Sequence, residues 1–201
     1  MLKLLSMSLS IPAVLCFSVV SSERATAAEK PVLVVFETDA GNITIEVDTV
    51  HAPNTSANFL KYVDAGLYDG ASFYRTVRPD TETNKDNPIN VIDGDLDRSR
   101  NADKFPPIPL ERTSVTGLKH LAGTVSAGRN RAADSAQSEV FICIEDTPSL
   151  DFGGMRNADG QGFAAFGKVV DGMDVVKKIW MMPAEKQRLV TPVKINKARR
   201  K

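Results

Sequence analysis

The sequence has 201 residues, of which 42% are hydrophobic and 25% are charged. This is enough chain for one domain with its own core, and it is too apolar for a disordered protein. Because 25 basic residues balance 25 acidic ones, bulk charge gives no reason to expect nucleic acid or an anionic membrane as a partner. Recognition must depend on shape and on the local chemistry of a few side chains.

The N-terminal segment predicts a secretory signal peptide. Lys3 precedes an uncharged run from Leu4 to Ser22, and the small residues Ala25 and Ala27 follow in a cleavage-site pattern. A transmembrane anchor is the alternative, but Pro12 and several serines interrupt the apolar run. We therefore expect residues 1–27 to be cleaved and residues 28–201 to be exported, either to a periplasm or out of the cell, with no stable insertion in a membrane.

Short β-rich runs separated by turn residues dominate the remaining chain. Residues 32–38 and 42–47 predict two strands of a hairpin. A helix opens at Pro53 and closes at Gly66, and a second one is expected over 173–181. Further strands are expected at 72–77, around 91, and at 123–126, 140–144, 164–169 and 191–196. Many short strands with only two helices favour a closed antiparallel barrel that is capped at its ends.

Three segments show the weakest patterning for regular structure. These are 78–90, 97–109 and the basic residues 197–201. We expect the last of these to be a solvated end of the chain.

Several blocks of the sequence occur in an order that resembles one known family. The blocks are Val35-Phe-Glu-Thr38, Gly41-Asn-Ile-Thr-Ile-Glu46, Gly66-Leu-Tyr-Asp-Gly70, Phe73-Tyr-Arg75, Leu121-Ala-Gly-Thr-Val-Ser126, Phe166-Gly-Lys-Val169 and Gly172-Met-Asp-Val-Val176. Together they resemble the cyclophilin-type peptidyl-prolyl cis-trans isomerases over roughly residues 32–195. The resemblance implies a mainly β fold: a closed antiparallel barrel of eight strands, capped by two α-helices.

The activity of that family explains which residues matter. Rotation about an Xaa-Pro bond must cross a barrier of about 18–20 kcal/mol, and a guanidinium aimed at the prolyl nitrogen stabilises the twisted amide. The resemblance implies that Arg75 is this catalytic guanidinium. It implies that Phe141, Leu150 and Phe163 form the apolar wall around the proline ring. Taken alone, without the flanking block, Arg75 is better explained as a solvated strand arginine, and each of the three apolar residues is also a plausible core residue.

The chain departs from the family at the pocket. Asp93 and Glu139 stand where the family commonly has two glutamines, although a shift of one residue would put Ile92 in place of Asp93. Gly128 lies in a third altered segment. We place Asp93, Glu139 and Gly128 among the substrate-binding residues. A carboxylate near Arg75 would draw it into a forked ion pair, so we hypothesise a reduced turnover.

Two functions follow from this reading. The first is a peptidyl-prolyl isomerase that accelerates rotation about Xaa-Pro bonds while exported proteins fold. The second is a catalytically weakened, chaperone-like module that binds proline peptides on the same barrel. For both we expect a monomer that takes proline-containing polypeptides as substrates, with no nucleic-acid partner, no metal and no cofactor.

Overall fold

The computed structural model describes residues 31–97 and 105–201. The predicted signal peptide, 1–27, lies outside the described residues, as do residues 98–104 of the weakly patterned segment 97–109. In the described part of the chain, none of the helices combines the length and the apolarity needed to cross a membrane. The strands are β1 (Val32–Thr38), β2 (Gly41–Val47), β3 (Ser72–Val77), β4 (Val91–Asp95), β5 (Thr124–Ala127), β6 (Val140–Cys143), β7 (Ala164–Asp171), β8 (Ala184–Glu185) and β9 (Arg188–Arg200).

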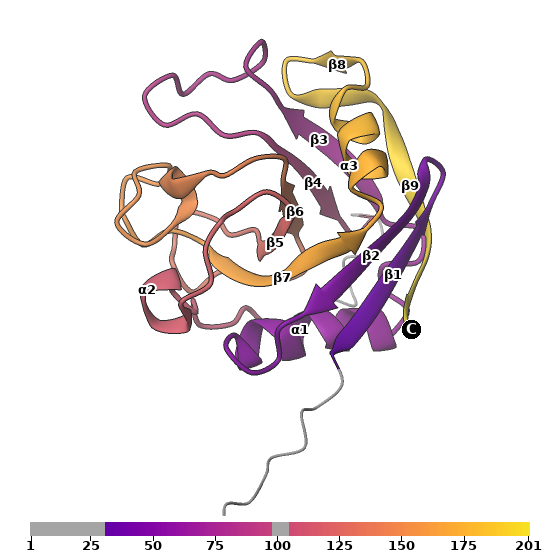
Figure 1. The fold of residues 1–201 in the computed structure, drawn as a ribbon, viewed down its shortest axis with the longest axis horizontal. Helices are drawn as coiled ribbons and strands as arrows, with labels where there is room; N and C mark the ends of the chain where they lie inside the picture. The colour runs from indigo at the N-terminus through magenta and orange to yellow at the C-terminus, as the bar shows by residue number, and fades with distance from the viewer. Residues whose placement is uncertain (1–30, 98–104) are drawn as a thin grey trace, which may run out of the picture. The chain divides into compact units, whose positions relative to one another are not determined.

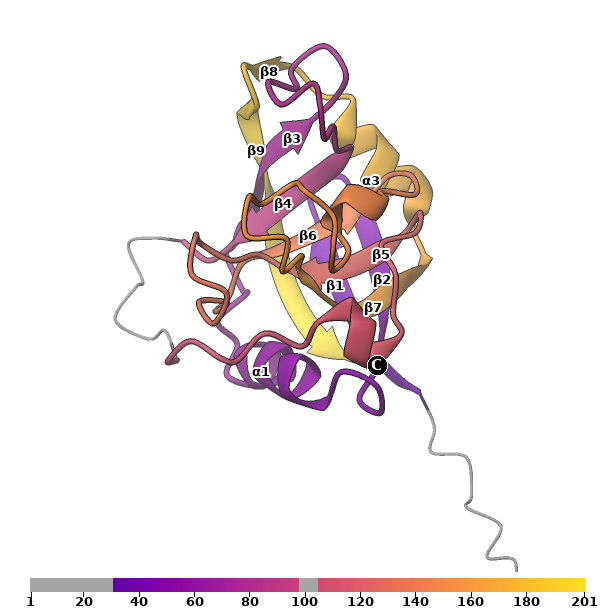
Figure 2. The same ribbon diagram turned by 90° about the vertical axis from the view of Figure 1, so that its left-hand side faces the viewer.

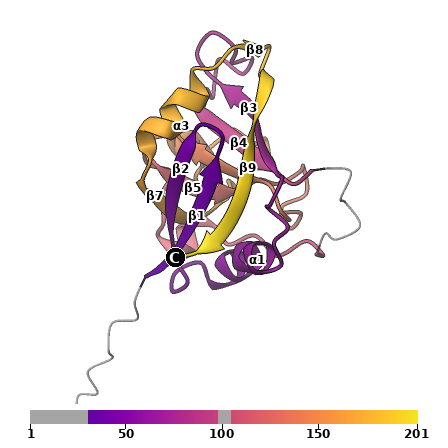
Figure 3. The ribbon, with the colours of Figure 1, turned by 90° about the vertical axis from the view of Figure 1, so that its right-hand side faces the viewer.

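Eight of these strands close into one antiparallel barrel. The order around the sheet is β1-β2-β7-β5-β6-β4-β3-β9, and β9 pairs with β1 to complete the ring. Strand β8 forms a short hairpin with β9 outside the ring. Figure 1 shows the ring from one side, and Figure 3 shows β9 lying alongside β1 where it closes. The predicted eight-stranded antiparallel barrel is confirmed.

Alternating side chains fill the barrel. In β1 the fully buried Val34 and Phe36 point to the same face, and in the paired β2 so do Ile43 and Ile45, as expected for strands with one face on a core. Phe36 lies within 6.3 Å of Phe73, measured between ring centroids. The hairpin predicted at this end of the chain is therefore present, and its inward face supplies much of the core.

Helices α1 (Pro53–Asp64) and α3 (Met173–Trp180) match the two predicted helices. They lie at opposite ends of the barrel (Figures 1 and 3). The short helix α2 (Thr113–Thr116) and the 3-10 turn η2 (Pro148–Leu150) were not predicted. Four residues are too few to produce a helical periodicity in the sequence, which explains why α2 escapes prediction.

The basic end of the chain is exposed as predicted, but it is a regular strand, which its weak patterning did not predict. Strand β9 runs on to Arg200, and Phe36 and Val34 of β1 stand opposite Ala198 and Arg200. Neighbouring residues at this end of β9 face opposite sides of the strand. Ala198 is buried, while Arg199 beside it is exposed and binds a glutamate of β1. Ala198 is the one buried residue between Lys197 and Arg200, so this end of β9 resembles a charged tail in the sequence.

A second, smaller hydrophobic cluster lies outside the barrel, on the outer face of β4 and β6. Its buried members are Val77, Ile89, Val91, Phe141, Cys143 and Leu150, with Phe163 packed against them. Figure 2 looks towards this side, with β3, β4 and β6 in view and the 78–90 loop above them. The barrel interior is thus complete without these residues, and they are left to build a surface site.

Candidate active site

Strand pairing places three of the predicted residues in one row. Arg75 of β3 stands opposite Asp93 of β4, which stands opposite Phe141 of β6. The register shifts between Phe73 and Arg75, so Tyr74 is an extra residue in β3. Such a bulge turns the residue after it to the other face of the strand. Without the bulge, Phe73 and Arg75 would share one face of the strand. With it, Phe73 points into the core and Arg75 lies on the outer row.

A cavity of about 250 Å³ opens over this row. All seven predicted site residues line it: Arg75, Asp93, Gly128, Glu139, Phe141, Leu150 and Phe163. The structure also decides between Ile92 and Asp93, because Ile92 is fully buried in the barrel core while Asp93 faces the cavity. The structure thus brings all seven predicted residues together around one cavity.

Arg75 is held mainly by a residue that the sequence did not reveal. Its Nε and Nη2 donate hydrogen bonds of 3.0 and 2.6 Å to Oε1 of Gln187, which precedes β9. Its Nη1 makes one contact of 3.3 Å with Oδ2 of Asp93. The hypothesised fork to a carboxylate is therefore not the arrangement found. The forked contact goes to a neutral amide, and 29% of the Arg75 side chain stays exposed.

Asp93 is an unusual neighbour for this guanidinium because only 5% of the residue is exposed. Burial raises its pKa from 3.8 to about 7; Arg75 opposes the rise and the nearby Glu139 adds to it. Burial wins because an ionised carboxylate loses its hydration in this position. Near neutral pH, Asp93 is therefore divided between its ionised and protonated forms, and only the ionised form competes with a substrate for Arg75.

Glu139 is engaged by a different partner. The hydroxyl of Tyr74, the bulged residue of β3, donates a 2.6 Å hydrogen bond to Oε1 of Glu139. Burial and the charge of Glu139 raise the pKa of the Tyr74 phenol, so the proton stays on the hydroxyl. The side chain of Glu139 packs over Gly128, where an added Cβ would lie 2.7 Å from Cγ of Glu139. Gly128 thus leaves the space that this glutamate occupies.

Aromatic rings form the apolar side of the cavity. Phe141 and Phe163 meet edge to face at a centroid distance of 5.3 Å, and Leu150 is buried beside them. Behind Phe141 the ring of His120 stacks at 5.8 Å. The predicted apolar wall is therefore assembled, and its size and chemistry suit a pyrrolidine ring.

A buried hydrogen-bonded chain of Ser126, His120 and Asp151 fixes that stacked ring. Nδ1 of His120 lies 2.8 Å from Oδ1 of Asp151, and Nε2 lies 3.0 Å from Oγ of Ser126. The residue types match those of a hydrolytic triad. However, Ser126 has no exposed surface, so its hydroxyl cannot reach a substrate carbonyl. These three residues support Phe141 rather than perform a hydrolysis.

Five further residues line the cavity that were not among the predicted site residues. They are Ile89, Val91, Arg129, Arg156 and Asn157. Val91 had a usable signal, because it lies two residues before Asp93 on the same strand face. Arg129 also had one, because it directly follows the predicted Gly128. Ile89, Arg156 and Asn157 carry no such signal, since they come from long irregular segments.

The barrel and this outer-face site together define the class of protein, and comparison with known proteins agrees. The family model described as cyclophilin type peptidyl-prolyl cis-trans isomerase/CLD matches residues 33–200. This chain belongs to the cyclophilin-type peptidyl-prolyl cis-trans isomerase family.

Two bacterial relatives support this assignment, and one solved structure shares the fold. The chain is 34% identical over 168 residues to peptidyl-prolyl cis-trans isomerase A of Dickeya dadantii, covering 84% of this chain and 81% of the relative. It is 33% identical over 147 residues to isomerase B of Escherichia coli, covering 73% and 83%. A cyclophilin-type isomerase of Cryptosporidium parvum superposes with a TM-score of 0.68 at 17% identity, covering 86% of this chain and 98% of that one. The last similarity shows the shared fold.

Proposed function

We propose that the outer-face cavity binds Xaa-Pro segments of polypeptides and that Arg75 catalyses their cis-trans isomerisation. The observation that carries the proposal is the row in which a partly exposed guanidinium stands two strands away from Phe141, with the cavity above both. The proline ring would rest against Phe141, Phe163 and Leu150. The prolyl nitrogen would then face Arg75.

The chemistry requires only differential binding. In the planar amide the nitrogen lone pair is shared with the carbonyl, and in the twisted transition state the nitrogen regains it. An N–H group of Arg75 that is directed at this nitrogen binds the twisted state better than either planar state, which lowers the barrier. Gln187 holds the guanidinium without adding a negative charge. The charge of Arg75 therefore remains available for the substrate.

The experiment is a protease-coupled isomerisation assay of an Xaa-Pro peptide with the chain from residue 28 and with its Arg75→Ala variant. We expect the variant to lose most of the activity and to keep its affinity for the peptide within severalfold, because the apolar wall is unchanged. Equal activity of the two proteins would contradict the assignment of Arg75.

The weakened binding module is the second candidate, and the contact of Arg75 with Asp93 favours it. Replacing Asp93 and Glu139 together by glutamine tests this candidate. The substitution removes both negative charges from the cavity and keeps side chains that can form hydrogen bonds. A rise in turnover would support suppression of catalysis by the carboxylates. Unchanged or lower turnover would contradict it.

We also propose that residues 1–27 direct export and that the monomeric product acts on exported proteins while they fold. The uncharged run and the small residues before Ala28 support this. The N-terminal sequence and the molar mass of protein recovered from outside the cytoplasm test both points. A first residue other than one near Ala28, or a dimeric mass, would contradict the respective part.

A further inference from the structure

We propose that Gln187 is a positioning residue for Arg75 and that it connects the catalytic guanidinium to the 78–90 loop. The inference rests on the proposed role of Arg75. Gln187 lies in the turn between β8 and β9, 112 residues from Arg75 in the sequence.

The contacts of Arg75 are unequal. The edge of the guanidinium that carries Nε and Nη2 is bound by the single oxygen of Gln187 at 3.0 and 2.6 Å. The Nη1 group makes the longer contact with Asp93, at 3.3 Å. Two short bonds restrict the rotation of the guanidinium about its stem more than one long bond does. The orientation of Arg75 is therefore set by Gln187.

Gln187 is itself fixed at both ends. Its backbone carbonyl accepts a 2.8 Å hydrogen bond from the N–H of Thr76, the residue after Arg75. Its side-chain Nε2 donates to the carbonyl oxygen of Thr81 at 3.2 Å. An amide has its donor and acceptor on opposite arms, so the bond to Thr81 directs the oxygen of Gln187 towards Arg75.

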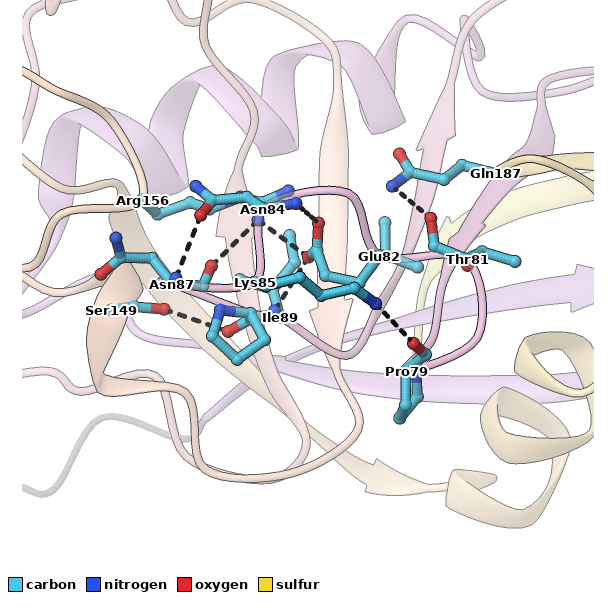
Figure 4. Close-up of polar contacts among 12 residues, drawn as sticks. Pro79, Thr81, Glu82, Asn84, Lys85, Asn87, Ile89, Ser149, Arg156 and Gln187 are labelled. Atoms are coloured by element: carbon cyan, nitrogen blue, oxygen red, sulfur yellow. Dashed lines mark hydrogen bonds and ion pairs between the residues drawn. The ribbon is translucent and has the colours of Figure 1, made fainter.

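The loop that offers the Thr81 carbonyl is anchored from within. The buried carboxylate of Glu82 accepts the N–H groups of Asn84 and Ile89 at 2.8 and 3.0 Å. It also pairs with Nη1 of Arg156 at 2.8 Å. Figure 4 shows these bonds, with Gln187 reaching Thr81 from the hairpin. The 78–90 loop thus links the hairpin to the far side of the cavity, where Arg156 and Ile89 both line it.

Arg75 therefore has two hydrogen-bond acceptors with opposite effects on its availability to a substrate. The amide of Gln187 leaves the guanidinium charged, whereas the carboxylate of Asp93 attracts it away from the substrate. Loss of the Gln187 oxygen would let Arg75 turn to Asp93, because a charged acceptor is the stronger one. The inference therefore makes a specific prediction: removing the Asp93 carboxylate must restore the activity that is lost when the Gln187 oxygen is removed. A residue that merely stabilised the hairpin would not show such a repair.

The test compares Gln187→Met with Gln161→Met in the isomerisation assay at pH 8. Gln161 is a matched control, because its Oε1 accepts a 2.6 Å bond from Arg112, a pair that does not line the cavity. We expect Gln187→Met to lower kcat about tenfold, with KM within twofold, and Gln161→Met to leave both unchanged. Adding Asp93→Asn to Gln187→Met should restore kcat at least threefold.

Unfolding monitored by the fluorescence of Trp180, the single tryptophan, verifies that each variant is folded. If Gln187→Met does not fold, Gln187→Asn replaces it, since its shorter arm leaves the carbonyl out of reach of Arg75. The inference is overturned by kcat within twofold of wild type in the variant used, or by a loss that Asp93→Asn does not repair. Activity retained by Arg75→Ala would instead contradict the proposed function.

Discussion

Arg75 and Arg129 line the same cavity, but their surroundings differ in kind. The side chain of Arg129 has no exposed surface: Nε donates to the carbonyl of Gly162, Nη2 pairs with Asp159 at 2.8 Å, and Nη1 donates to two further carbonyls. It also lies over the ring of Phe163. Arg75 is bound by one amide and contacts one carboxylate at 3.3 Å, and 29% of its side chain is exposed. A guanidinium that is fully buried among its acceptors supports structure, and one that stays partly exposed is available to a substrate.

Replacement of Arg75 by lysine is expected to have the largest effect on activity. Lysine keeps the charge, but it lacks the planar fork that binds Gln187 and faces the prolyl nitrogen. We expect kcat/KM to fall about 100-fold, with the free energy of unfolding unchanged within about 0.5 kcal/mol. Progress curves of isomerisation and urea titrations measure the two quantities. A large loss of stability would contradict the distinction between the two arginines.

Replacement of Arg129 by lysine should lower the stability more than the activity. Lysine cannot satisfy three carbonyls and Asp159 together, so buried acceptors lose their donors. We expect a loss of about 3 kcal/mol in the free energy of unfolding and a smaller fractional loss in kcat than in Arg75→Lys. Arg131→Lys, at an exposed position nearby, is the control and should be neutral.

The effect of Asp93→Asn on the free energy of unfolding should depend on pH. The folded state holds the Asp93 proton up to about pH 7, against 3.8 in the unfolded chain, so wild-type stability is lost as the pH rises through this window. The full shift corresponds to about 4 kcal/mol. We expect the variant to be more stable than wild type by up to this amount at pH 8, because the net shift already includes the attraction to Arg75, and to gain little at pH 4. Equal differences at both pH values would contradict the burial of an ionisable Asp93.

Asp93 also predicts the shape of the activity profile. Above pH 7 its carboxylate competes for Arg75, so wild-type kcat should decrease severalfold between pH 6 and pH 8. The decrease should be absent in Asp93→Asn. The protease-coupled assay with the coupling enzyme in excess at each pH provides this measurement.

Glu82→Gln should have the smallest effect. Burial raises the pKa of Glu82, but the N–H groups of Asn84 and Ile89 together with Arg156 outweigh it and leave the pKa below its ordinary value. The carboxylate therefore contributes stability at neutral pH that is lost on acidification. We expect the variant to be about 1.5 kcal/mol less stable at pH 7 and closer to wild type below pH 4. Glu145→Gln, on an exposed glutamate, is the control.

The barrel leaves local patterns in the sequence, whereas the cavity walls were predicted from the resemblance to the family. The β-rich runs at 32–38 and 42–47 predicted the first hairpin, and the order Val91-Ile92 before Asp93 favoured the alignment that the structure bears out. Gln187 left no pattern, since its role depends on a hairpin that folds back over a strand more than one hundred residues away. The loop over 78–90 was equally hidden, because one buried side chain, Glu82, satisfies backbone groups that a sequence pattern cannot assign.

The β1–β9 seam has a consequence for how the molecule itself acquires its shape. Its partners include Val34 with Arg200 and Phe36 with Ala198, so the pairing that completes the ring joins residues separated by almost the whole described chain. Bringing such distant segments together is entropically costly and slow. During synthesis the edge of β1 that pairs with β9 stays unpaired until β9 has been made. The barrel of this cyclophilin-type isomerase therefore closes only after β9 has left the ribosome.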